Sequence, residues 1–160
     1  MTTSEPTPSS LRMQRVIPAP PHEVYRAWLD PALLRRWLAP GEWRVTRIEV
    51  DERVGGHFRV WQGTDDGDVG GFECQILDLV PSERIVFNWG FVGPERTAGP
   101  SFDSRLTITF ERAPNGHTAL TLVHEQLDAL GAAMPNVAEN VEPGWAMVLD
   151  KMTTALAPVA

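Results

Sequence analysis

A run of segments in which apolar and polar residues alternate fills most of the chain and constrains its fold more than any other feature. Alternation with a period of two is typical of β-strands that bury one face of a sheet. Because the turns between the segments are short, neighbouring strands are expected to pair antiparallel. The alternating segments after residue 42 are 48–50, 57–63, 71–79, 84–91, 105–111 and 118–126, and an earlier strand is expected over 11–19.

Turn-forming residues separate these segments. Residues 55–56 are two glycines that predict a tight turn, and residues 114–116 (Pro-Asn-Gly) predict a hairpin. The polar stretch 64–70 reads as a further hairpin loop. Asp51 and Arg53 are expected to pair beside the turn at 55–56. Trp61 is out of phase with its strand, which indicates either an exposed contact or a β-bulge.

Helical spacing is found at both ends of this run. Residues 20–31 place Val24 and Trp28 on one face, and Asp30 followed by Pro31 predicts an N-cap for a second short helix that ends at Leu38. Residues 142–158 predict a longer helix, with Pro143 in its first turn and Pro158 at its end. Its apolar stripe follows the i, i+3, i+4, i+7 rule and consists of Trp145, Val148, Leu149, Met152, Ala155 and Leu156.

These elements predict an α+β domain. An antiparallel sheet with one apolar face needs a cover, and the stripe of the last helix is complementary to that face. We therefore expect a curved sheet of about seven strands wrapped around the C-terminal helix, with two short helices after the first strand. One domain over 11–158 and a disordered tail over 1–10 are expected.

Composition excludes several classes of function. The net charge of −7 opposes binding to nucleic acid or to anionic lipid, since both favour a basic surface. A single cysteine, Cys74, allows no internal disulfide and suggests a reducing, cytoplasmic setting. The N-terminus does not read as a secretory signal, and no apolar stretch is long enough to cross a bilayer. Neither nucleic acid nor a membrane is therefore expected as a partner.

The order of elements is similar to the helix-grip fold of the START-like (SRPBCC) superfamily. Five stretches resemble one branch, which is named for the activator of the ninety-kilodalton heat-shock protein's ATPase; they are 19–40, 51–58, 79–89, 118–127 and 144–152. The resemblance implies a domain that binds a hydrophobic molecule, because members of the superfamily bind lipids, hormones and polyketides. Some members are cyclases or aromatases, and fold alone does not decide between these activities.

A cavity between the sheet and the last helix is the predicted ligand site, because aromatic faces there can stack on a flat apolar ligand. The alternative is that these side chains only fill the core. The residues expected to line the cavity are Trp37, Phe58, Val60, Cys74, Phe87, Trp89, Phe91, Phe110, Leu122, His124, Trp145, Leu149 and Met152. Two long loops, 92–104 and 128–144, are expected to control entry; the second is expected to hold a short helix over 135–140 that carries Met134 and Val137 towards the opening.

His124 is the candidate for chemistry. It is in phase with Leu120 and Leu122, so its imidazole should point inward, either as an acid–base or as a neutral structural group. Cys74 fits a small buried hydrophobe better than a nucleophile. Neither a metal nor a cofactor is expected, since His22, His57, His117 and His124 fall on different elements and residues 65–68 do not match a calcium loop.

Three functions follow in order of preference. The first is binding of a small aromatic or polyketide-like molecule, and the second is an enzyme that acts on such a ligand through His124. The third is a chaperone co-regulator. A chaperone partner is not expected, because eukaryotic activators carry sequence before this domain that is absent here. Whether the protein forms a homodimer is left open.

Overall fold

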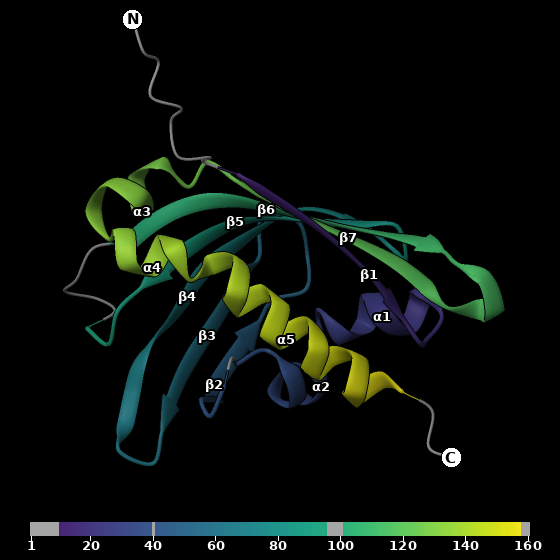
Figure 1. Ribbon diagram of the computed structural model, residues 1–160, viewed down its shortest axis with the longest axis horizontal. Coiled ribbons are helices and arrows are strands. Elements are labelled where there is room, and N and C mark those ends of the chain that lie inside the picture. Colours follow the sequence, from purple (N-terminus) through teal and green to yellow (C-terminus); the bar gives the residue numbers. More distant parts are fainter. Residues whose placement is uncertain (1–9, 40, 96–100, 158–160) are drawn as a thin grey trace, which may run out of the picture.

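The computed structural model describes residues 10–39, 41–95 and 101–157 and shows one seven-stranded antiparallel sheet in the order β1-β7-β6-β5-β4-β3-β2 (Figure 1). The expected tail lies outside the described residues, apart from Ser10. The α+β class, the antiparallel sheet and the two short helices after the first strand are confirmed. The strands are β1 (Leu11–Ile17), β2 (Arg44–Val50), β3 (His57–Thr64), β4 (Gly67–Val80), β5 (Arg84–Val92), β6 (Ser101–Arg112) and β7 (Thr118–Glu125).

The helices gather on the concave side of the sheet (Figure 1). The long helix α5 (Val141–Leu156) crosses beneath the strands, with α1 (Pro21–Ala27) and α2 (Pro31–Trp37) towards its C-terminal end. Two short helices, α3 (Asp128–Ala133) and α4 (Pro135–Glu139), lead into its N-terminal end. The sheet thus grips α5 on one side, while the other side of the helix faces solvent.

Local sequence explains where the helices begin. Asp30 caps α2 because its Oδ1 accepts a hydrogen bond from the Ala32 amide at 2.9 Å, and Pro31 takes the first helical position. Pro21 opens α1 in the same way. The predicted stripe of α5 is buried at Trp145, Val148, Leu149 and Met152. Ala155 and Leu156 are half-buried.

Two hairpins differ in detail from the sequence-based expectation, and a third agrees with it. The loop expected over 64–70 is only a two-residue connection, since β3 continues to Thr64 and β4 starts at Gly67. The loop expected over 92–104 is also shorter, because Val92 pairs with Ser101 and the β5–β6 ladder runs to that point. These strand ends carry Gly and charged residues in place of alternating apolar ones, so the period-two pattern did not reveal them. Residues 114–116 form the expected turn, with Asn115 at φ 67° and Gly116 at φ 74°.

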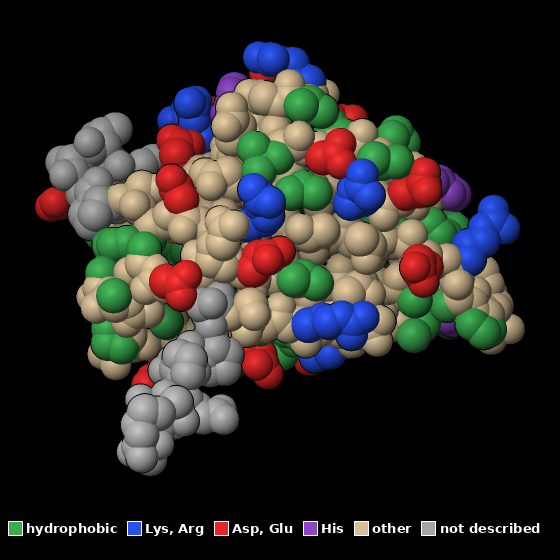
Figure 2. Space-filling model, turned by 90° about the horizontal axis from the view of Figure 1, so that it is seen from above, with side chains coloured by type: hydrophobic (Ala, Val, Ile, Leu, Met, Phe, Trp, Pro, Cys, Tyr) green, Lys and Arg blue, Asp and Glu red, His purple; other side chains and the backbone are tan. Residues whose placement is uncertain are grey.

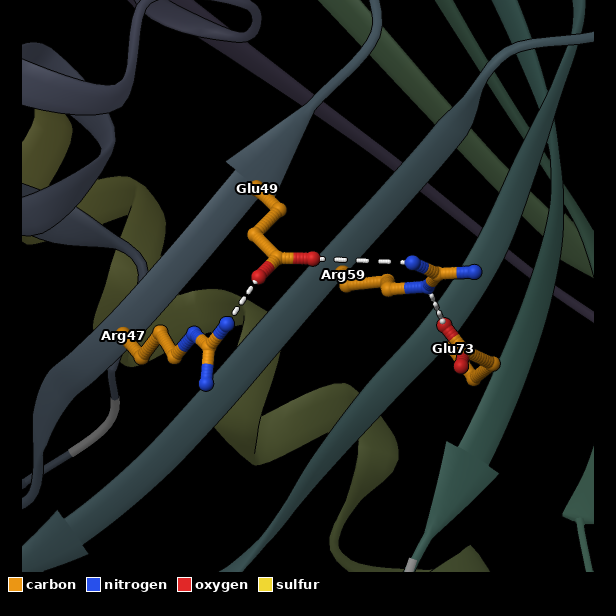
Figure 3. Close-up of polar contacts among 4 residues, drawn as sticks. All are labelled: Arg47, Glu49, Arg59 and Glu73. Atoms are coloured by element: carbon orange, nitrogen blue, oxygen red, sulfur yellow. Dashed lines mark hydrogen bonds and ion pairs between the residues drawn. The ribbon is translucent and has the colours of Figure 1, made fainter. Parts of the chain in front are cut away.

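The outer face of the sheet carries intermingled charges (Figure 2). On β2, β3 and β4 an ion-pair ladder runs from Arg47 through Glu49 and Arg59 to Glu73, in front of the strands with α5 behind them (Figure 3). Arg59 lies 2.8 Å from Glu73 and 3.5 Å from Glu49. The hydrogen bond from Arg47 is the main cause that lowers the pKa of Glu49.

Two smaller expectations from the sequence concern Trp61 and the pair Asp51 and Arg53. Trp61 is half-buried, with the Arg47 guanidinium 4.8 Å from the centre of its ring, and a register shift follows it at residues 62–63. Asp51 and Arg53 form the expected ion pair, with 2.7 Å between Arg53 Nε and Asp51 Oδ2. The four charged side chains drawn in Figure 3 lie on the far side of the sheet from α5.

Candidate ligand pocket between the sheet and the last helix

A pocket of about 810 Å³ opens between the sheet and the first half of α5. Pockets of 300–1,000 Å³ are typical of sites that hold a small organic molecule. Its sheet wall includes the rings of Phe72, Trp89, Phe91 and Phe102. Its helical wall consists of Val141, Gly144, Trp145, Met147 and Val148 from α5, with Leu130, Met134 and Val137 from α3, α4 and the residue between them. These side chains are apolar, and five of them are aromatic.

The mouth of the pocket is rimmed by exposed apolar side chains. Trp43, Val69, Met134 and Met147 all line it and are 42%, 39%, 43% and 45% exposed. They make up four of the seven large hydrophobic residues that the described part of the chain exposes. Clusters of exposed apolar residues mark sites that contact a ligand or partner, whereas single ones need no explanation.

The residues predicted to line the cavity fall into two groups. Trp89, Phe91 and Trp145 lie in the walls of this pocket, and so do Met134 and Val137 from the expected entry loop. The remaining predicted residues are buried in the core and do not line it; they are Trp37, Phe58, Val60, Cys74, Phe87, Phe110, Leu122, His124, Leu149 and Met152. The sheet therefore closes tightly on the second half of α5 and stands away only from its first half.

Several wall residues were missed from the sequence. Phe72 is in phase with Cys74 on β4, which was a signal that it faces the concave side. Phe102 lies at the start of β6, where the strand was not expected. Helix α3, which contributes Leu130, has only six residues and too few apolar positions to show a periodicity. The short helix expected over 135–140 is present as α4.

His124 lies directly behind the aromatic wall. It is fully buried, its ring stacks on Phe91 at 5.6 Å between ring centres, and both ring nitrogens have partners. Trp145 Nε1 donates a hydrogen bond to His124 Nδ1 at 3.0 Å. His124 Nε2 lies 2.7 Å from Ser104 Oγ, which in turn donates to the carbonyl oxygen of Trp89 at 2.7 Å. The hydrogen-bonded chain thus joins two residues of the pocket wall, Trp89 and Trp145.

These partners define the protonation of the imidazole. An indole nitrogen can only donate, so His124 Nδ1 must be an acceptor and the ring proton must be on Nε2. Burial lowers the pKa of His124 from 6.5 to about 3, which agrees with a ring that stays neutral. Protonation of His124 Nδ1 would place its N–H group against the N–H group of Trp145 Nε1.

In this arrangement neither ring nitrogen of His124 is free to act as an acid–base. A general base needs an unoccupied nitrogen within reach of substrate, and here one nitrogen accepts from Trp145 while the other carries its proton towards Ser104. For the same reason the Ser104–His124 pair is not an activated nucleophile, because the imidazole cannot accept the serine proton through a nitrogen that is already protonated. His124 instead fixes the position of Trp145.

Replacing Ser104 with alanine is expected to lower the free energy of unfolding by about 1–3 kcal/mol, because the His124 Nε2–H group would be left buried without an acceptor. Urea unfolding followed by circular dichroism measures this. The matched control is Ser101→Ala on the same strand, where the side chain is exposed and the change should stay within about 0.5 kcal/mol. Equal effects of the two substitutions would contradict the network.

Other site types have no support in the described residues. No three His, Cys, Asp or Glu side chains come together there as a metal site. Cys74 is buried opposite Trp89 in the β4–β5 ladder and does not line the pocket. Among the helices described above, none is long and apolar enough to cross a membrane.

The fold and the pocket together define a class of protein. A sheet curved around a C-terminal helix, with two short helices after the first strand, is the helix-grip fold of the START-like (SRPBCC) superfamily. Residues 18–157 match the family described as Activator of Hsp90 ATPase homolog 1-like protein, and the chain belongs to that family. Proteins of this family are typically ligand-binding.

Solved structures agree with this assignment. A protein of Chromobacterium violaceum is similar over 96% of this chain and 100% of its own, with 31% identity and a TM-score of 0.75. A protein of Mycobacterium smegmatis shares the fold over 95% of this chain and 93% of its own, with 21% identity and a TM-score of 0.77. A protein of Nitrosomonas europaea shares the fold over 92% of this chain and 93% of its own, with 22% identity and a TM-score of 0.73.

Proposed function

We propose that the protein binds a small, flat, hydrophobic molecule, aromatic or polyketide-like, in the pocket at the first half of α5. The observation that carries this proposal is an open volume of about 810 Å³ walled by the rings of Phe72, Trp89, Phe91 and Trp145. Flat aromatic ligands gain from offset or edge-to-face contacts with such rings in addition to the burial of apolar area.

The arrangement of the walls supports binding over a purely structural role. The core beside the pocket is already filled, since Phe58, Phe87 and Leu149 are fully buried. An apolar pocket left open beside a filled core forfeits contacts that larger side chains would supply. The Trp145 indole is also held in a fixed orientation by His124, and a wall that is ordered in advance lowers the entropic penalty of binding.

Thermal shift with a panel of two- and three-ring aromatic compounds tests the proposal. A compound that binds only the folded protein raises the Tm, and the shift grows with the logarithm of its free concentration. We expect at least one compound of the panel to give a saturable 1:1 complex. A panel in which no compound raises the Tm would contradict the proposal.

We further propose that the segment from Leu130 to Asn140 gates the pocket. It contributes Met134, Asn136 and Val137 to the wall, and these residues are exposed or half-buried. Ligand binding is expected to slow amide hydrogen exchange in α3 and α4 several-fold, because opening of this segment would expose the bound molecule. Strand β7 is the internal control, and its exchange should change little. Exchange in α3 and α4 as slow as in β7 and unchanged by ligand would contradict the gate.

The remaining expectations stay predictions. Co-purification with the ninety-kilodalton chaperone and an assay of its ATPase rate would test a chaperone partner, which we do not expect. Gel filtration with light scattering would test a homodimer. Cell fractionation would test the cytoplasmic location that the single Cys74 suggests.

A further inference from the structure

One polar side chain borders the pocket from the concave face of the sheet. Gln62 is in phase with Phe58 and Val60 on β3, two apolar residues that are fully buried. Gln62 is itself only 4% exposed, and it lines the pocket. A buried amide carries donors on its nitrogen and an acceptor oxygen, and the partners of each group show what the side chain does.

The protein uses one end of this amide. Gln62 Nε2 donates a hydrogen bond to the carbonyl oxygen of Leu38 at 3.0 Å, at the end of α2. Because a carbonyl oxygen can only accept, this contact identifies which end of the amide is the nitrogen. The other end, Gln62 Oε1, accepts no hydrogen bond from the described residues.

The amide oxygen is not sealed inside the protein. Among the described residues, the fully enclosed side-chain polar atoms without a partner are Trp28 Nε1 and Trp89 Nε1. Gln62 Oε1 also lacks a partner but is not one of these atoms, so part of its surface stays accessible. Opposite Gln62 in the β3–β4 pair is Gly70, which lines the pocket and has no side chain to cover the amide. Since Gln62 borders the pocket on the concave side, the accessible oxygen faces the pocket.

We propose that Gln62 Oε1 accepts a hydrogen bond from a hydroxyl group of the bound ligand, so that the pocket prefers phenol-type aromatic molecules over analogues without the hydroxyl. This inference rests on the proposed ligand-binding function and names the class of ligand. An apolar ligand that covers Oε1 removes its water and supplies no donor, whereas a hydroxyl restores the hydrogen bond.

A neutral donor fits the place better than an ammonium group. The described residues that line the pocket include one acidic side chain, Glu95, and it is exposed. A cation beside Gln62 would therefore lose its hydration without gaining a buried counter-charge. A phenol keeps its proton at pH 7 and carries no charge.

Matched pairs of probes isolate this hydrogen bond. The pairs are 2-naphthol with 2-methylnaphthalene and 2-hydroxyfluorenone with 2-methylfluorenone, because a hydroxyl and a methyl group are similar in size. Their dissociation constants are measured with the wild-type protein, with Gln62→Met and with Gln75→Met as the control. The methyl-to-hydroxyl ratio of Kd is compared between proteins, because the difference in hydration of the two probes then cancels.

The control carries the same substitution outside the pocket. Gln75 Nε2 also donates to a backbone carbonyl, that of Gly55 at 3.3 Å, but Gln75 is exposed and does not line the pocket. We expect the ratio to be about five- to tenfold higher for the wild-type protein than for Gln62→Met, which corresponds to about 1–1.4 kcal/mol. Gln75→Met should keep the ratio of the wild-type protein.

A second readout stands even if Gln62→Met fails to fold. In wild-type protein labelled with ¹³C and ¹⁵N, the side-chain carbonyl carbon of Gln62 should move downfield when 2-naphthol is added and much less with 2-methylnaphthalene. The Nε2 protons of Gln62 should change little, because their bond to Leu38 is kept.

Two results would overturn the inference in distinguishable ways. Suppose that hydroxyl and methyl probes both bind, but the ratio is the same for all three proteins or the Gln62 carbon responds alike to both probes. The ligand pocket then stands and the hydrogen bond to Gln62 does not. If no member of either pair binds the wild-type protein, the proposed function falls and this inference falls with it.

Discussion

Lowering the pH from 7 to 5 is expected to reduce the free energy of unfolding by about 2 kcal/mol through His124 alone. The imidazole is fully buried, and burial lowers its pKa from 6.5 to about 3. In the unfolded chain the same ring has its ordinary pKa and takes up a proton below pH 6.5. The folded protein cannot do so, because Nδ1 already accepts a hydrogen bond from Trp145.

The sign of the effect follows from proton uptake. Between pH 6.5 and about 3 the unfolded state binds more protons than the folded state at this site, so acid favours unfolding. The contribution of His124 to stability is complete above pH 6.5 and is lost progressively as the pH falls towards 3. Each pH unit within this window changes the free energy by about 1.4 kcal/mol.

Urea unfolding at a series of pH values measures this dependence. The variant His124→Gln cannot titrate in this range, so its stability should fall about 2 kcal/mol less than that of the wild-type protein between pH 7 and pH 5. In the folded wild-type protein the His124 ring resonances should stay constant down to pH 4.5. An inflection in those resonances near pH 6 would contradict the hydrogen-bonded arrangement.

Filling the pocket from α5 is expected to weaken ligand binding at least tenfold without destabilising the protein. Gly144 lines the pocket, and a Cβ atom added there would meet no atom within 4 Å. The positions three and four residues away on the helix, which are Asn140, Val141, Met147 and Val148, also line it. The side chain of Gly144→Trp would therefore enter the pocket, and removing a helical glycine should raise stability by about 0.5 kcal/mol.

The matched control is Asp150→Trp in the second half of the same helix. Asp150 is exposed and does not line the pocket. This variant should bind fluorenone within about twofold of the wild-type protein. Calorimetric titration gives both affinities. Unchanged binding in Gly144→Trp would place the ligand elsewhere.

The fold was accessible from the sequence because its main signals are local. Alternation placed the centres of the strands, and the stripe of α5 identified the face that the sheet covers. Where polar or glycine-rich residues extend the ladders, as at Gly67 and Ser101, pairing depends on the partner strand and the local pattern gives no indication. The hairpins are accordingly longer than expected.

The sequence predicted a cavity between the sheet and the last helix, but not which of the expected residues line it. Leu149 and Trp145 belong to the same apolar stripe, yet only Trp145 lines the pocket, because the curvature of the sheet decides where it separates from the helix. The inward direction of His124 followed from its phase on β7. Its bonds to Ser104 and Trp145 join residues 20 and 21 positions away in the chain, and no spacing rule links them.

The methionine methyl groups offer the most direct test of an open apolar pocket beside a filled core. Met134 and Met147 line the pocket, whereas Met13 and Met152 are buried in the core. In protein labelled with ¹³C at the methionine methyl groups, titration with fluorenone should shift Met134 and Met147 in a saturable way and leave Met13 and Met152 in place. The account would be contradicted if the resonances of Met134 and Met147 stayed fixed while an aromatic compound binds. It would be contradicted equally if no aromatic compound bound at all.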